Sequence, residues 1–247
     1  MNRLPGALAR HEKTGGAGRR WPRRPAAAGI LLVCLLLASY SLLHLRPVGI
    51  GGPVPTGPEG ERAAGRMMSK ASSLVAGLER PGDWGEAFSE AEANAWLSID
   101  LPRHAPGFLV GGFSAPKVQF LERRAAISSL VRWGPLSAQL WAILEVTVRS
   151  DNLVAVGVDS AGLGAVPLPP GVILRALASR AEAAGATTEI RFLDGGPVLL
   201  VLLPGTTTKK TSGQRSEYHL GGVRITPGEV VLAGTTRGLP HQEGSPP

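Results

Sequence analysis

Few residues of this sequence have the types and spacing that catalysis or metal binding requires. Asp100 and His104 are four positions apart, which would place them on one face of a helix. Pro102 lies between them, interrupts such a helix and predicts a surface loop instead. His219 is the second histidine of the central region, and the five histidines of the chain are too scattered to build a metal site. We therefore expect no metal and no cofactor.

Two short motifs resemble nucleophile or phosphate sites without matching them. Ser160 follows an apolar run, but a nucleophile elbow needs glycine two residues earlier, where this chain has Val158. The segment from Gly157 to Gly162 therefore predicts a turn. The segment 205–211 ends in Lys-Lys-Thr, but it lacks the first glycine and the Gly-Lys step of a phosphate loop. We expect no catalytic residue and no enzymatic activity.

The net charge of +7 is concentrated at the amino terminus. Residues 1–25 carry seven basic side chains and one acidic side chain, whereas the rest of the chain carries 19 basic and 18 acidic ones. A nearly neutral remainder argues against a surface that tracks nucleic-acid phosphates, and we expect no nucleic-acid partner. The single cysteine, Cys34, excludes an intrachain disulfide framework.

An uncharged apolar run extends over residues 26–45. A helix of twenty residues is roughly 30 Å long, which matches the hydrocarbon core of a bilayer. Arginines are concentrated before the run, so we expect the amino terminus to stay in the cytoplasm: Arg19, Arg20, Arg23 and Arg24. A cleaved signal peptide is the alternative, but its apolar region is usually shorter. We predict a single-pass inner-membrane anchor and an exported domain.

The whole chain divides into five parts by composition. Residues 1–25 form a basic cytoplasmic tail and 26–45 the transmembrane anchor, after which the Gly/Pro-rich stretch 46–66 predicts a linker. Residues 67–234 are long enough for one exported domain with its own core. The polar end, 235–247, predicts a disordered tail.

Helical patterns frame the start of this domain. Residues 67–78 carry a helical pattern that ends before Pro81-Gly82. Ser89 and Glu92 have the spacing of a capping box, and Phe88 and Ala93 occupy the two positions of a hydrophobic staple. We expect a helix to begin at Ser89 and to face the core.

Strand patterns dominate the middle of the domain. From Leu136 to Val148 every even position is apolar, which predicts one strand roughly 45 Å long. Its neighbours 123–133 and 153–158 are separated from it by short turns, so the three strands predict an antiparallel meander. A strand of this length implies a curved or strongly twisted sheet.

A helix and two hairpins complete the expected order. The helix carries one apolar stripe and is followed by Gly185: Ile173, Leu174, Leu177 and Ala181. The hairpins pair 190–193 with 198–203 and 218–225 with 229–233. The predicted fold class is α+β, with a long curved antiparallel sheet packed on one main helix and preceded by a single transmembrane helix.

Two short segments and the order of elements suggest a family. They are Phe88-Ser-Glu-Ala-Glu-Ala-Asn-Ala-Trp-Leu97, which enters a helix, and Gly164-Ala-Val-Pro-Leu-Pro169, which leads into the later one. Over residues 85–234 the chain resembles anchored bacterial envelope proteins that are similar in build to the tubular lipid-binding superfamily (half-barrel type). The resemblance implies binding of an acyl chain or a role in lipid or envelope traffic, and it implies no catalytic residues.

The predicted sheet has more apolar area than a helix of about 20 Å can cover. Uncovered apolar area must pack, bind or dimerise. The expected groove positions lie on the long strand and on the later helix: Leu140, Ala142, Leu144, Val146, Leu174 and Leu177. Two alternatives stay open, a sheet that twists until its core is closed and a scaffold that docks another protein, without a ligand, through a sheet edge or the strand 136–148. The expected partners are thus the bilayer, a lipid or other apolar ligand, or an envelope protein.

Overall fold

The computed structural model describes Cys34, Ser41 and residues 51–104, 112–134, 136–193, 195–208 and 215–239. The chain divides into two units, Met1–Tyr40 and Ser41–Pro247, and the fold below is that of the second. Among the described residues, no helix is both long enough and apolar enough to cross a bilayer. The predicted anchor 26–45 lies outside them, apart from Cys34 and Ser41, and so does the basic tail 1–25.

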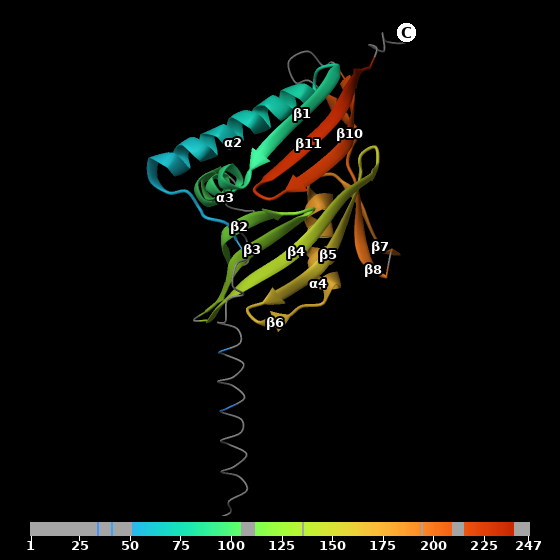
Figure 1. Ribbon diagram of the computed structural model, residues 1–247. Helices are drawn as coiled ribbons and strands as arrows, with labels where there is room; N and C mark the ends of the chain where they lie inside the picture. The colour runs from blue at the N-terminus through green and yellow to red at the C-terminus, as the bar shows by residue number, and fades with distance from the viewer. Residues whose placement is uncertain are drawn as a thin grey trace, which may run out of the picture. The chain divides into compact units, whose positions relative to one another are not determined.

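The second unit is α+β with a large antiparallel sheet, as predicted (Figure 1). Its strands form two sheets rather than the single predicted one. The larger sheet has the order β2-β3-β4-β5-β8-β7, with the short β6 paired to β5, and the smaller has the order β1-β11-β10-β9. The strands of the larger sheet are β2 (Phe113–Leu121), β3 (Arg124–Trp133), β4 (Leu136–Ser150), β5 (Leu153–Leu163), β6 (Val166–Pro167), β7 (Thr187–Leu193) and β8 (Gly196–Leu202). Those of the smaller are β1 (Gly82–Ser89), β9 (Thr206–Thr208), β10 (Arg215–Thr226) and β11 (Glu229–Gly238).

The predicted meander is confirmed. β3 pairs with β4 from Arg124↔Glu145 to Trp133↔Leu136, and β4 pairs with β5 in turn. The even positions of β4 from Ala138 to Val148 face the core, whereas Leu136 at the start of the strand is exposed, and the alternation of side chains along a strand explains why the odd positions face the other way. The hairpins β7–β8 and β10–β11 also form as predicted.

The segment that predicted a turn after Gly157 is instead part of β5. Opposite Ile143 and Leu144 of β4, the register shifts between Ser160 and Val158, so Asp159 is the extra residue of a β-bulge. The turn-forming residues are accommodated by this bulge, and the strand continues to Leu163.

Helix α3 (Glu90–His104) begins at the predicted capping box. Glu92 N donates to Ser89 Oγ at 3.3 Å, and Ser89 N donates to Glu92 Oε2 at 3.1 Å. The helix continues through Pro102 to His104, contrary to the predicted loop, because a proline in the last turn removes only one backbone hydrogen bond. His104 Nδ1 lies 3.0 Å from the backbone oxygen of Asp100 rather than against its carboxylate.

The predicted linker 46–66 is wrong over its second half. Helix α2 runs over Gly57–Leu78, ten residues ahead of the expected start. Its small residues Gly60, Ala63 and Ala64 are buried, and the two alanines pack against Ala95 of α3. A Cβ at Gly60 would lie 2.6 Å from the backbone oxygen of Pro55. The small residues that suggest a flexible linker thus allow close packing between backbones.

The predicted disordered tail also begins too early. β11 extends to Gly238 because β1 supplies its backbone partners, from Gly82↔Thr236 to Ser89↔Glu229. β1 has two glycines and no clear alternation, so its strand conformation depends on β11. In Figure 1, α2 runs along β1, and α3 lies between α2 and the larger sheet.

Helix α4 (Pro170–Ala183) confirms the predicted later helix and is followed by Gly185 at φ +88°. It packs on β5, β7 and β8. Leu174 is fully buried against Val154, Leu199 and Leu220, so α4 and β10 cover the same face of the larger sheet. At the other end of that face, α3 packs on β2.

Candidate functional site

The six residues of the predicted groove come together, but as parts of a packed core. Ala142, Leu144 and Leu174 are 1%, 7% and 0% exposed. Leu140, Val146 and Leu177 pack against Ala142 and Leu144, together with Ile173 of α4. Helix α4 therefore fills the space beside β4 in which an acyl chain was expected. Val146 is the one residue of the six that lines any of the three cavities described next.

The three cavities adjoin one another around Arg123 and Glu145, and we call them together the outer groove. Their volumes are about 540, 440 and 480 Å³. The largest also contains Thr147 and Gly157, which alternate with partly buried valines that pack against the core on the α4 side, so it opens on the opposite face of the sheet.

The outer groove has mixed charge. Arg124 beside it donates to Asp159 at 3.1 Å, with both side chains about half exposed. Arg123 adopts φ +60° in the β2–β3 turn and donates its backbone N–H to Ile225 O at 3.1 Å, which fixes the turn on β10. Solvated pairs of this kind contribute little binding energy.

His219 is the histidine that the structure places near carboxylates. Its Nδ1 lies 3.6 Å from Asp151 Oδ2, and its Nε2 lies 3.8 Å from Glu217 Oε1. Both ring nitrogens are buried and make no hydrogen bond with the described residues. His219 lines none of the three cavities, and its cluster with Asp151 and Glu217 lies between β10 and the β4–β5 turn.

The edges of the two sheets differ in how they are covered. At β2, the Asn94 side chain makes two hydrogen bonds of 2.8 Å with the backbone of Val118, and Phe120 N donates to Glu90 Oε2 at 2.8 Å. Phe120 O accepts a further bond from Gly228 N at 3.1 Å. Side chains of α3 and the β10–β11 turn therefore occupy the positions of an added strand at β2.

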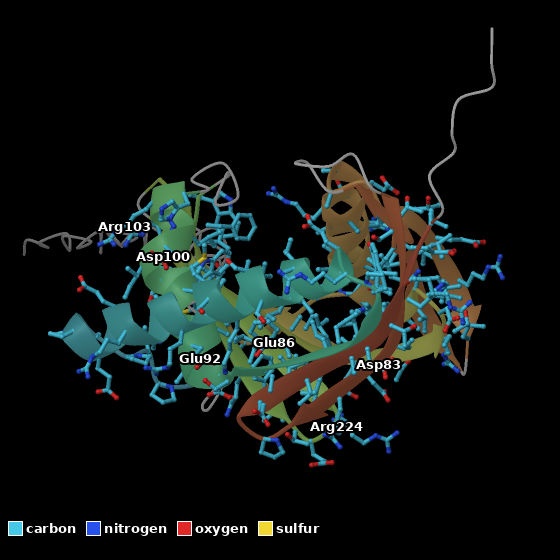
Figure 2. The ribbon with its side chains drawn as sticks, turned by 90° about the horizontal axis from the view of Figure 1, so that it is seen from above. Asp83, Glu86, Glu92, Asp100, Arg103 and Arg224 are labelled. Carbon is cyan, nitrogen blue, oxygen red and sulfur yellow. The ribbon has the colours of Figure 1, made fainter. Side chains whose placement is uncertain are left out.

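The edge of β1 is covered by α2. Lys70 Nζ donates to Ala87 O at 2.8 Å and to Glu92 Oε2 at 2.8 Å, and Arg66 Nε donates to Glu92 Oε1 at 3.2 Å. Figure 2 shows Glu92 on α3 beside α2. Burial raises the pKa of Glu92, but the hydrogen bonds from Lys70, Ser89 N and Arg66 together with the charge of Lys70 outweigh it, so the pKa is lowered.

The other two edge strands are β9, which has three residues, and β7, which has seven, and the described residues leave the longer β7 uncovered. It pairs with β8 on one side, and no backbone hydrogen bond to its other side is present in the described part of the chain. Phe192 is 82% exposed and Ile190 is 38% exposed. Between them in sequence, Arg191 donates to Glu189 at 2.7 Å. We take this β7 edge as the candidate functional site.

Reasoning from the sequence did not single out the β7 edge. The alternation of Thr188, Ile190 and Phe192 with Glu189 and Arg191 is visible in the chain. It predicts a strand with one apolar face, but strand order decides whether that strand is central or at an edge.

No known family model matches this chain, and neither a curated protein nor a solved structure is significantly similar to it. The resemblance to anchored envelope proteins of the lipid-binding type therefore stays a prediction.

Proposed function

We propose that this protein is a noncatalytic docking module of a bacterial cell envelope, held at the inner membrane by residues 26–45. Its folded domain binds a protein strand through the β7 edge. An added strand supplies backbone hydrogen bonds along the edge, and side chains on alternate positions supply selectivity.

The observation that carries this proposal is the contrast between the edges. β2 and β1 are covered by side chains of α3 and α2, whereas β7 exposes Ile190 and Phe192 beside a backbone with no outer partner among the described residues. A long uncovered edge with exposed apolar side chains is a template for pairing with another chain.

The packing around α4 supports docking over binding of an acyl chain. Leu174 is fully buried, and Ala142 and Leu144 contact Ile173, so these side chains already have apolar neighbours. An acyl chain would have to displace α4 to reach them.

The test uses the full chain in bacterial cells, with a photoreactive phenylalanine at position 192. We expect a protein adduct of defined mass. The matched control carries the same group at Trp133, an aromatic residue that is 50% exposed on β3 of the same sheet, and we expect no adduct there. Absence of a protein adduct from position 192, or equal adducts from both positions, would contradict docking at β7. Saturable uptake of a fluorescent fatty acid by the purified full chain would favour the lipid alternative.

A further inference from the structure

We infer that the strand docked on β7 is β7 of a second copy of this chain, paired antiparallel about a two-fold axis at Ile190. This inference rests on the proposed function, because it names the occupant of the same edge.

The register follows from the symmetry. With the two-fold axis at Ile190, the numbers of any two facing residues add up to 380, so Ile190 of one copy faces Ile190 of the other. Glu189 then faces Arg191 of the second copy, Thr188 faces Phe192, and Thr187 faces Leu193. Such a contact is isologous and closes as a dimer.

The charges of β7 complement this register. Cross-strand pairs of opposite charge stabilise an antiparallel sheet, and like charges destabilise it. The axis at Ile190 creates two Glu189–Arg191 pairs between the copies. Within one copy, the same two side chains form an ion pair at 2.7 Å, with both more than half exposed, so exchanging partners needs little reorganisation.

The apolar side chains of β7 also gain cover. Ile190 lies opposite Leu199 of β8, which contacts Leu174 of α4, so Ile190 and Phe192 are on the α4 face of the sheet. In the dimer, the two Ile190 side chains are adjacent at the axis. Each Phe192 then lies beside Thr188 of the second copy and diagonal to its Ile190, within reach of an aromatic ring.

The backbone geometry permits this pairing. Along an edge strand, every second residue directs its N–H and C=O outward. Because 380 is even, two facing residues are either both even-numbered or both odd-numbered. Residues that direct their backbone groups outward in one copy therefore face residues that do the same in the other. The ladder of the larger sheet can therefore continue across the axis without a bulge.

Charged residues on an edge strand often prevent such pairing, so the arrangement of the charges on β7 decides whether they oppose or favour pairing between two copies. β7 carries no lysine, and its two charges have opposite signs and are placed symmetrically about Ile190. This arrangement favours self-pairing in the register described. Two like charges at the same positions would oppose it.

The first experiment exchanges the charges and measures the mass of the full chain in detergent micelles by sedimentation. Glu189→Arg and Arg191→Glu each place like charges opposite one another, and we expect each variant to raise the dissociation constant of the dimer about tenfold or more. A mixture of the two variants restores opposite charges across the axis, so we expect a heterodimer. In the mixture, residues 189 and 191 of each single copy still carry like charges. Recovery of the dimer would therefore report the contacts between copies and not the ion pair within one copy.

The second experiment traps the axis with a disulfide in a Cys34→Ser background. Ile190→Cys places two thiols directly opposite each other, and we expect an oxidised dimer. Phe192→Cys is the matched control. Its side chain is more exposed, but the two thiols would be four residues apart, about 14 Å along the strands, which is too far for a disulfide.

The results separate this inference from the proposed function. Single charge variants that remain dimeric, a mixture that remains monomeric, or crosslinking through Phe192→Cys rather than Ile190→Cys would overturn self-pairing. If the photoreactive group at position 192 then gives an adduct with a different protein, docking at β7 stands with another occupant. If it gives no protein adduct, both the proposed function and this inference fail.

Discussion

The side chain of Asn94 makes with Val118 both hydrogen bonds that a neighbouring strand would make. Nδ2 donates to Val118 O, and Val118 N donates to Oδ1, each at 2.8 Å. Asn94 is fully buried, so water does not replace these bonds when the amide is removed. Asn152 repeats the arrangement at β10, where Leu220 N donates to its Oδ1 at 2.7 Å and its Nδ2 donates to Tyr218 O at 2.8 Å.

Asn94→Leu should lower the free energy of unfolding by about 2–4 kcal/mol, because it leaves a buried donor and a buried acceptor without partners. Urea denaturation followed by fluorescence measures the change. Ser72→Ala is the control, since the exposed Ser72 hydroxyl bonds only to Met68 O one turn earlier, and a change below about 0.5 kcal/mol is expected. Equal effects of the two substitutions would show that Asn94 does not hold β2.

Glu92 should make the unfolding free energy depend on pH in the acid range. Its folded-state pKa is lowered below the ordinary value of 4.5, so its contribution is fully present above pH 4.5 and is lost as the pH falls through the folded-state pKa. Glu92→Gln should therefore be less stable than the unsubstituted chain at pH 7, by about 1–3 kcal/mol. Urea midpoints for the two chains should converge below pH 4.5. A constant difference across this range would contradict the assigned role of Glu92.

Gly234→Ala should destabilise the smaller sheet strongly. A Cβ at Gly234 would lie 2.1 Å from His219 O and 2.4 Å from Trp84 Cζ2, so backbone and ring must both move. We expect a loss of about 1–3 kcal/mol, which thermal unfolding can measure. Gly222→Ala is the matched control on β10, because its added Cβ meets nothing within 4 Å. Similar melting temperatures for the two variants would show that Trp84 does not pack against Gly234.

Leu174→Ala should behave as a core substitution. The residue is fully buried between α4 and β8, so we expect a loss of about 2–5 kcal/mol in unfolding free energy. Leu202→Ala, at a position that is 48% exposed, should have a much smaller effect. If Leu174→Ala left the stability unchanged but altered uptake of a fluorescent fatty acid, Leu174 would line a ligand site rather than the core.

The local pattern of the sequence determined the elements that depend on near neighbours. The even-position alternation of β4 predicts its length and its buried face, and Ser89 with Glu92 predicts the start of α3, because both signals act within a few residues. The apolar stripe of α4 and the hairpins β7–β8 and β10–β11 are predicted for the same reason.

Tertiary structure decided the features that depend on distant partners. β1 is a strand because β11 lies beside it, and the small residues of α2 form a buried helix because α3 accepts close packing. Leu140, Ala142, Leu144, Val146, Leu174 and Leu177 are apolar in any arrangement, but only the position of α4 determines that they form a core. Strand order, not composition, placed β7 at an edge, because backbone groups are left unpaired only where the sheet ends.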